Sequence, residues 1–190
     1  MLQVIDSRTY TIEEYFELEL NSETRHEYRA GEIYPMTGGT PQHNRISGNL
    51  YIALSLALRR KPYEVFHVDQ RLWIPERQMG AYPNVMVVQK PIELQTGRTD
   101  TVLNPCLIAE VLSKSTQDYD HGEKFTAYRT IPTFTEYLLI DQYQIHVEHY
   151  QKTSANQWLL SEYTDPTIVL SFAAFEFQIQ IADLYENIEL

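Results

Sequence analysis

The chain has 190 residues, 43% of them hydrophobic, with a single cysteine and a formal net charge of −11. This length suits one domain over residues 1–190, the lone cysteine excludes an internal disulfide framework, and no apolar run is long enough to span a bilayer. The acidic balance argues against a protein that coats nucleic acid non-specifically.

The first third of the chain predicts two helices with a hairpin between them. Thr11 and Glu14 form a capping-box pattern, so a first helix should begin directly after Thr11. The segment that follows is typical of a hairpin turning at Ala30–Gly31. Thr40–Pro41 resembles an N-cap followed by proline in the first turn, and an apolar stripe extends this second helix to about Arg60.

The middle of the chain predicts three strands. Glu64–Pro75 is expected to form one strand, and Tyr82–Gln89 a second, whose almost wholly apolar run is typical of a central strand buried on both faces. Asn84 stands at the entrance of the second strand. Cys106–Leu112 forms the third strand, and Glu110 lies inside it.

Glu110 needs a partner, because a carboxylate is rarely buried unless it is paired, hydrogen-bonded or bound to a cation. A helix over Asp120–Thr130 places Lys124 and Tyr128 on one face, and a strand at Thr135–Ile140 follows it. This strand–helix–strand unit returns Lys124 toward Glu110, so we predict that the two side chains converge in one pocket. A purely structural ion pair is the competing interpretation.

The last third of the chain predicts a scaffold of short strands and a small C-terminal helix. The strands are expected at Ile145–Gln151, Gln157–Tyr163 and Thr167–Leu170, and the helix from about Ile181. His146 and His149 are poor joint metal ligands, because a three-residue separation on a strand sends their side chains to opposite faces. The N-terminal segment lacks the features of a secretory signal, so a soluble, cytoplasmic protein is expected.

Charge is distributed unevenly along the chain. Residues 1–32 carry 3 Lys and Arg against 8 Asp and Glu, and residues 131–190 carry 1 against 9. Residues 33–130 carry 11 against 9, which is a slight basic excess. Since the Debye length is about 8 Å at physiological salt, a local basic groove there could attract phosphate. An acidic protein with a nearly neutral middle is the alternative.

Five sequence patterns resemble one known family along nearly the whole chain. They are HEYRAGEIYPMTGGTPQHNRI at 26–46, YPNV at 82–85, AEVLSKST at 109–116, YDHGEKFTAYR at 119–129 and EYLLID at 136–141. The family is that of the Uma-type restriction endonucleases, within the PD-(D/E)xK nuclease superfamily. The resemblance implies an α/β fold in which a restriction-endonuclease-like mixed β-sheet is flanked by helices, here with additional C-terminal antiparallel strands.

The resemblance also implies a divalent-metal site for Mg²⁺ or Mn²⁺. In the superfamily an aspartate opening one strand and a glutamate on the next hold the metal, and here those positions are Asn84 and Glu110. Leu112 occupies the place of the usual lysine, so the family's lysine is expected to be Lys124 on the following helix. Hard oxygen ligands suit Mg²⁺, and a lysine can offset charge that develops on phosphate oxygens.

Two further residues, Glu27 and His43, belong to the N-terminal pattern of the family and are expected to complete the site. Asn84 departs from the family pattern, because its amide oxygen can coordinate a metal but brings no negative charge. Ala30 also replaces a residue that is commonly acidic or an amide.

Three functional hypotheses follow. The first is a metal-dependent nuclease that hydrolyses phosphodiester bonds in DNA and is weakened by Asn84. The second is a catalytically silent nuclease fold that binds nucleic acid or a protein partner, and the third is an assembly protein in which the pairing of Glu110 with Lys124 is structural. DNA binding is expected to be weak and salt-dependent. A homodimer is left open.

Overall fold

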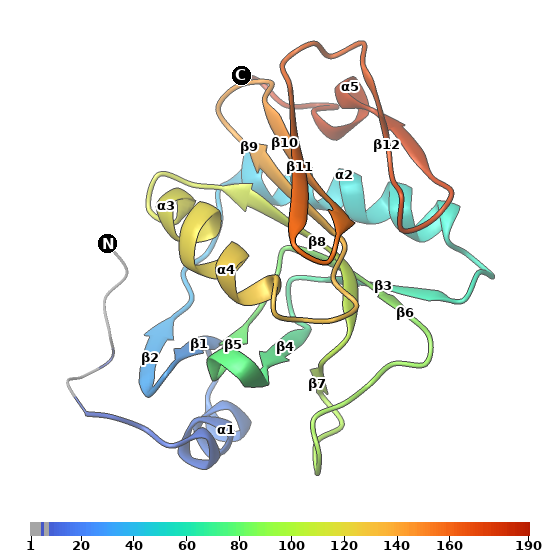
Figure 1. Ribbon diagram of the computed structural model, residues 1–190. Helices are drawn as coiled ribbons and strands as arrows, with labels where there is room; N and C mark the ends of the chain where they lie inside the picture. The colour runs from blue at the N-terminus through green and yellow to red at the C-terminus, as the bar shows by residue number, and fades with distance from the viewer. Residues whose placement is uncertain (1–4, 6–7) are drawn as a thin grey trace.

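The computed structural model describes residue 5 and residues 8–190 and has a mixed α/β fold (Figure 1). Two larger sheets and a small C-terminal sheet make up its β-structure. The fold class predicted from the sequence, mixed sheets flanked by helices with extra antiparallel strands at the C-terminus, is confirmed. The interpretation of the N-terminal segment rests partly on residues 1–4 and 6–7, which lie outside the described part.

The six-stranded sheet forms the centre of the molecule. In spatial order its strands are β11 (Gln157–Tyr163), β10 (Val147–Ser154), β9 (Glu136–Asp141), β8 (Pro105–Leu112), β6 (Val85–Gln89) and β3 (Tyr63–His67). β8 and β9 run parallel and the other neighbours antiparallel, so the sheet is mixed. Every residue of β8 is buried, because apolar layers cover both of its faces.

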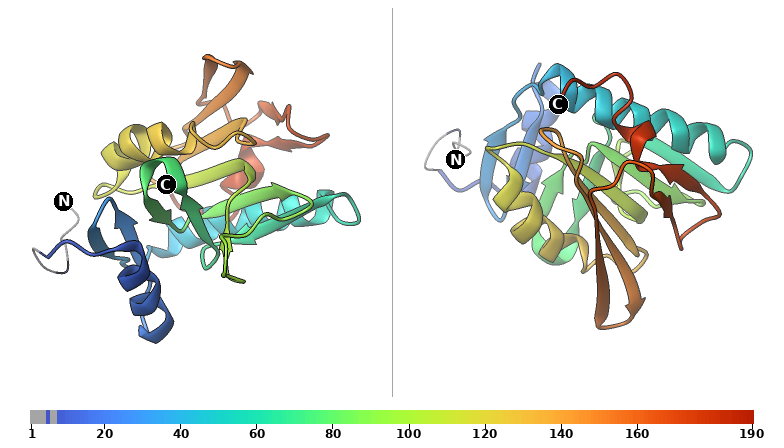
Figure 2. Two further views of the ribbon diagram at one scale, coloured as in Figure 1. Left: turned by 60° about the horizontal axis from the view of Figure 1, so that its bottom comes forward. Right: turned by 90° about the horizontal axis from the view of Figure 1, so that it is seen from above.

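Helices cover the two faces of this sheet (Figure 2). α2 (Pro41–Ala57) and α5 (Ile181–Leu184) pack on one face, where they meet the odd-numbered apolar residues of β8, Leu107, Ala109 and Val111. The other face packs against a helical segment made of α3 (Gln117–Tyr119), a π-helical turn (Asp120–Lys124) and α4 (Phe125–Tyr128). The alternation along β8 therefore turns Glu110 toward the helix that carries Lys124.

The five-stranded sheet carries the N-terminal hairpin. Its spatial order is β2 (Glu32–Pro35), β1 (His26–Arg29), β5 (Met79–Ala81), β4 (Arg71–Ile74) and β7 (Thr101–Val102). α1 (Ile12–Asn21) begins at the predicted capping box and packs Tyr15 against Tyr28 and Trp73 of this sheet. The hairpin turns at Ala30 and Gly31, whose φ angles of 45° and 105° favour glycine at the second position.

The prediction of a single strand over Glu64–Pro75 is wrong. The segment forms β3 in the six-stranded sheet and β4 in the five-stranded sheet, and the chain changes direction between them at Val68, whose φ is +44°. Both halves are rich in apolar, strand-forming residues, so the pattern alone could not reveal the corner. This corner carries the chain from one sheet to the other.

Other boundaries differ by a few residues. The second helix ends at Ala57 rather than Arg60, and the helix predicted from Asp120 begins three residues earlier, at Gln117. The strand expected at Thr167–Leu170 is β12 (Val169–Ser171), which pairs with an unpredicted β13 (Gln178–Gln180). None of the helices formed by the described residues combines the length and apolar character that crossing a bilayer requires.

Glu136 links the central sheet to the C-terminal segment. Its side chain is fully buried and accepts hydrogen bonds from the backbone N–H groups of Ala173 and Ala174, at 2.8 and 3.2 Å, and from Nε2 of Gln151 at 3.1 Å. Burial by itself raises the pKa of Glu136, but the hydrogen bond with His149 and those from Ala173 and Gln151 hold it below its ordinary value. The ionised form of Glu136 therefore stabilises the fold.

We expect Glu136→Gln to lower the free energy of unfolding by about 1–3 kcal/mol at pH 7. The folded-state pKa of Glu136 is lower than its unfolded-state pKa. The stability contributed by ionised Glu136 is therefore present above the unfolded-state pKa and is lost as the pH falls through the folded-state pKa. Urea denaturation at pH 7 and pH 4 should show a smaller deficit at the lower pH. Glu162→Gln, at an exposed carboxylate on β11, is the control. An equal deficit at both pH values would contradict the assignment.

Candidate active site

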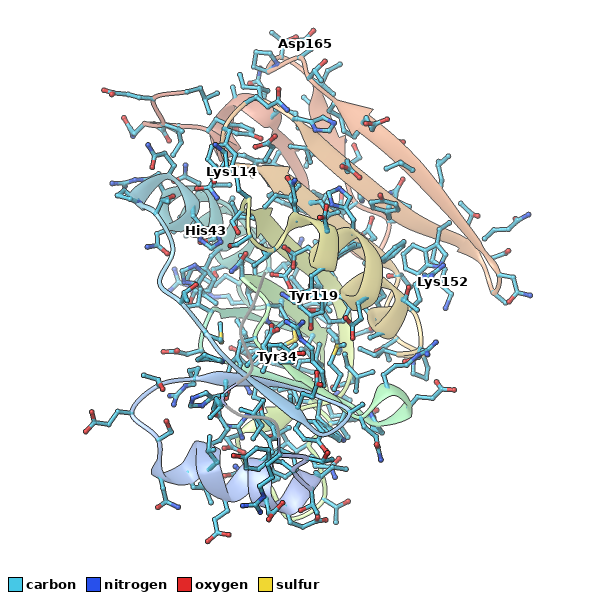
Figure 3. All side chains as sticks on the ribbon, turned by 90° about the vertical axis from the view of Figure 1, so that its left-hand side faces the viewer. Tyr34, His43, Lys114, Tyr119, Lys152 and Asp165 are labelled. Carbon is cyan, nitrogen blue, oxygen red and sulfur yellow. The ribbon has the colours of Figure 1, made fainter. Side chains whose placement is uncertain are left out.

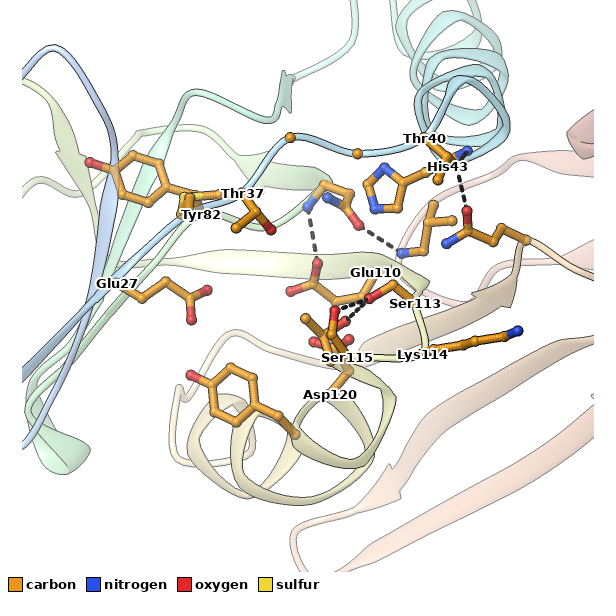
Figure 4. A pocket seen from close by; sticks show the side chains of 18 of the residues that line it. Glu27, Thr37, Thr40, His43, Tyr82, Glu110, Ser113, Lys114, Ser115 and Asp120 are labelled. Carbon is orange, nitrogen blue, oxygen red and sulfur yellow. Dashed lines mark hydrogen bonds between the residues drawn. The ribbon is translucent and has the colours of Figure 1, made fainter. Parts of the chain in front are cut away.

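The candidate site lies where the two larger sheets meet. β5 of one sheet ends at Ala81 and β6 of the other begins at Val85, so Asn84 stands at the crossing. Glu110 comes from β8, Lys124 from the π-helical turn and Glu27 from β1. All four residues line one cavity of about 350 Å³, and Figure 4 shows Glu27, Glu110 and Asp120 around it.

Lys124 occupies the centre of a cluster of carboxylates. Its Nζ lies 3.0 Å from Oδ1 of Asp120, 3.1 Å from Oε1 of Glu110 and 3.4 Å from Oε1 of Glu27. The convergence of Glu110 and Lys124 predicted from the sequence is therefore present. Glu27, also expected at the site, joins them, and the ammonium group lies within ion-pair distance of three carboxylates at once.

Asp120 is the member of the cluster that sequence reasoning missed. It is buried and precedes Lys124 by four residues on the π-helical turn. A carboxylate four residues before a lysine is a recognised helical pair, and this spacing was the available signal. π-helical turns occur frequently at functional sites. Tyr128, which shares a face with Lys124 as predicted, donates a hydrogen bond from its hydroxyl to Oε1 of Glu110 over 2.9 Å.

Asn84 joins β6 to β8 through its backbone and its side chain. Its backbone N–H donates to Oε2 of Glu110 over 3.2 Å, and its Oδ1 accepts the backbone N–H of Val111 over 2.7 Å. The amide oxygen therefore already has a structural partner, although a carbonyl oxygen keeps a second lone pair. A carboxylate at this position could accept the same N–H.

Glu27 is anchored by a second cation. Arg29 donates to Oε2 of Glu27 over 2.9 Å, and its guanidinium lies 4.1 Å from the ring centroid of Tyr34 and 3.4 Å from that of Tyr119. Burial raises the pKa of Glu27, but the charges of Lys124 and Arg29 outweigh this and hold the pKa below its ordinary value. Glu27 is therefore ionised at neutral pH.

Glu110 titrates near neutrality. Burial raises its pKa to about 7, the charge of Lys124 opposes this shift, and the neighbouring charge of Asp120 adds to it. The pKa of Lys124 lies well above its ordinary value, because its carboxylate partners outweigh the effect of burial. Lys124 is therefore charged, while Glu110 can gain or lose a proton within the physiological range.

His43 lines the same cavity but does not join the cluster. It lies on the first turn of α2, where its backbone N–H donates to Oγ1 of Thr40 over 3.1 Å. Its Nδ1 is buried without a hydrogen-bond partner among the described residues. Burial lowers the pKa of His43, so its imidazole is neutral at physiological pH. The structure places His43 beside the site, as a wall residue.

The oxygen donors of the site match a hard divalent cation in kind. Carboxylates from Glu27, Glu110 and Asp120 and the amide oxygen of Asn84 line one cavity. Within the part of the chain that the structure describes, no three His, Cys, Asp or Glu side chains form a ready-made metal centre. Mg²⁺ often uses only one or two carboxylates and completes its shell with water and substrate phosphate. Such a small ligand set fits these residues.

Known proteins resemble this chain in sequence and in fold. Residues 12–183 match the family model Uma2, described as "Putative restriction endonuclease". Two uncharacterized proteins of Synechocystis are similar to this chain. The protein sll1609 is 41% identical and the match covers 91% of this chain and 98% of sll1609. The protein slr1290 is 34% identical and the match covers 80% of this chain and 78% of slr1290. A crystal structure from Anabaena variabilis, described as a putative nuclease belonging to DUF820, shares the fold with a TM-score of 0.76, 17% identity and coverage of 93% and 97%.

Proposed function

Because the chain belongs to the Uma2 family of restriction-endonuclease-type proteins, we propose that it is a metal-dependent nuclease that hydrolyses phosphodiester bonds in DNA. The observation that carries this proposal is the convergence of Glu110, Asp120, Glu27 and Lys124 in one cavity. Buried groups with perturbed pKa values gathered in a cleft are typical of catalytic sites.

Glu110 and Asn84 would hold the Mg²⁺ or Mn²⁺ ion. When bound, such an ion lowers the pKa of coordinated water and neutralises charge on phosphate oxygens. The ammonium of Lys124 would donate hydrogen bonds to a phosphate oxygen on which negative charge develops, because a buried, fixed cation acts strongly in a water-poor cavity.

The neighbouring residues would fix the positions of these groups. Asp120 and Glu27 hold the ammonium of Lys124 between them, and Tyr128 orients the Glu110 carboxylate through its hydroxyl. His43 would close the cavity wall and exclude water. A site held on strands and a short helix in this way keeps its geometry better than one held on loops.

A catalytically silent nuclease fold is the second candidate. Asn84 favours it, since a neutral amide replaces the carboxylate expected at that position and its oxygen is already bonded to Val111. Metal-dependent cleavage separates the two candidates.

The proposal is tested by incubating the protein with mixed-sequence DNA in Mn²⁺, Mg²⁺ or EDTA. We expect slow cleavage in either metal, none in EDTA, and a loss of at least about 100-fold in Glu110→Gln, because the change removes the carboxylate charge of the site. Glu162→Gln, on the exposed face of β11, should cleave like the wild type. Cleavage by Glu110→Gln at the wild-type rate would show that the site is wrongly assigned, and cleavage in EDTA would exclude metal dependence.

Binding to a mixed-sequence duplex is expected to be weak and to fall steeply as salt is added. The net charge of −11 repels phosphate, so only local cations can attract it. The logarithm of the association constant should decrease against the logarithm of salt concentration with a slope of about 0.9 per neutralised phosphate. Fluorescence anisotropy from low to physiological salt measures this slope, and tight, salt-insensitive binding would argue against the prediction. A homodimer and a cytoplasmic location stay predictions from the sequence.

A further inference from the structure

The reactive groups of the site are almost closed off from solvent. The exposed fractions are 2% for Glu110 and Asp120 and 6% for Glu27 and Lys124. A phosphodiester that reaches them must therefore enter the cavity rather than lie across its mouth. This requirement restricts the kinds of nucleic acid that the site can take.

The cavity is small and has walls on several sides. Figure 4 shows the segment that carries Thr37 and Thr40 crossing above Glu110, with Ser113, Lys114 and Ser115 beside it. A volume of about 350 Å³ is at the lower end of pockets for small molecules. A nucleotide of a duplex must be unpaired and unstacked before it can enter such a space, which opposes binding. A nucleotide of a single strand is already unpaired.

Tyr143 stands at the mouth of the cavity as an exposed aromatic surface. It lines the cavity, and 48% of its surface is exposed. Nζ of Lys114, itself exposed, lies 5.2 Å from the centroid of the Tyr143 ring. Figure 3 shows Tyr34, Tyr119, His43 and Lys114 along the same side of the molecule. The ammonium lies over one face of the Tyr143 ring, so a base would stack on the opposite face with its phosphate near the charge. Aromatic rings and cations together are the groups that bind single-stranded nucleic acids.

The charge of the protein favours this mode of binding over duplex binding. Duplex binding without base contacts depends on the neutralisation of many phosphates, which a chain of net charge −11 supports poorly. Base stacking on an aromatic ring adds affinity with each stacked base and does not depend on the net charge of the protein. Stacking can therefore supply affinity for nucleic acid although the negative net charge of the protein opposes binding.

We propose that the site takes single-stranded nucleic acid, with one unpaired nucleotide entering the cavity while a neighbouring base stacks on Tyr143 and its phosphate contacts Lys114. This inference rests on the proposed nuclease function and narrows its substrate to strand ends, loops and unpaired segments. It gives the phosphodiester a route to Glu110 and Lys124 that needs no opening of the fold.

The test measures fluorescence anisotropy of the wild-type protein with a labelled 20-nucleotide DNA strand, its blunt duplex and the RNA strand of the same sequence, in EDTA and in Ca²⁺. We expect the single strand to bind at least about tenfold more tightly than the duplex. Tyr143→Ala should weaken single-strand binding by about tenfold, and Tyr143→Phe should retain it. Lys114→Gln should reduce the salt slope by about 0.7. Leu159→Ala, an exposed apolar residue on β11, is the control.

Each outcome decides the proposal. Equal or tighter binding of the duplex, or unchanged single-strand binding in Tyr143→Ala, would overturn it while leaving metal-dependent cleavage intact. Binding of the RNA strand alone would support the single-strand site and overturn DNA as the substrate. If no nucleic acid binds, the inference fails. The nuclease proposal is judged separately, by cleavage in Mn²⁺ with and without Glu110→Gln.

Discussion

Asn84→Asp is expected to increase Mg²⁺- or Mn²⁺-dependent cleavage of DNA by about tenfold or more. The change adds one negative charge beside a divalent ion, and the interaction at short range is of order several kcal/mol even with an effective dielectric constant near 20. Since about 1.4 kcal/mol corresponds to a factor of ten, the metal should bind more tightly and the active fraction should rise. The aspartate can still accept the backbone N–H of Val111, so the fold should be retained.

Two controls accompany this substitution. Adding Glu110→Ala to Asn84→Asp should remove the gained activity, and the melting temperature of Asn84→Asp should rise more steeply with added Mn²⁺ than that of the wild type, because tighter metal binding stabilises the native state. If the wild type already cleaves well and Asn84→Asp changes neither cleavage nor the metal-induced shift, the neutral amide is an adequate ligand. If neither protein cleaves nor binds metal, the silent fold replaces the nuclease.

Lys124→Met is expected to destabilise the protein by about 3–5 kcal/mol at neutral pH. The change leaves the buried carboxylates of Glu27, Glu110 and Asp120 without their shared cation. Removing one partner of a buried ion pair destabilises a protein by this amount, because the other charge stays buried without compensation. Because the folded-state pKa of Lys124 is raised, its contribution is complete below its unfolded-state pKa and is lost only in strongly alkaline solution.

The deficit of Lys124→Met should grow with pH. In the wild type the charge of Lys124 lowers the pKa values of Glu110 and Glu27. Without this charge both folded-state pKa values rise further, so ionising these carboxyl groups opposes folding of the variant increasingly as the pH rises. Urea denaturation at pH 5, 7 and 8.5 should therefore show the smallest loss at pH 5. Adding Asp120→Asn should recover part of the stability, and Lys90→Met, which removes only an exposed ion pair with Glu64, should have little effect. A deficit that is small or independent of pH would mean that water solvates the cluster.

Much of the site could be predicted from local patterns. The alternation along Cys106–Leu112 determines the face of Glu110, and the strand–helix–strand connection returns Lys124 to that face, because parallel strands require a crossover. The position of Tyr128 on the same helix face as Lys124 follows from their spacing of four residues. Each of these residues is positioned by an element whose periodicity is visible in the sequence.

The remaining features depend on contacts between segments far apart in the chain. Glu27 reaches Lys124 only because the hairpin sheet docks against the central sheet, and no periodicity encodes that docking. Asn84 hydrogen-bonds to Val111 across two strands, which a single-sequence pattern cannot register. The corner at Val68 was missed because strand propensity continues through it.

The path of the chain between the sheets also bears on how the protein folds. Between β3 and β6 the chain leaves the central sheet at Val68, adds β4 and β5 to the other sheet, and returns at Asn84. The strands of one sheet therefore alternate along the chain with strands of the other. Strand pairing between residues far apart in the sequence forms slowly during folding. Glu27 and Lys124, 97 positions apart, meet only after both sheets have docked. We infer that Lys124 can pair with Glu110 and Asp120 within its own strand–helix unit, and that docking of the hairpin sheet adds Glu27, already paired with Arg29, to this cluster in a late stage of folding.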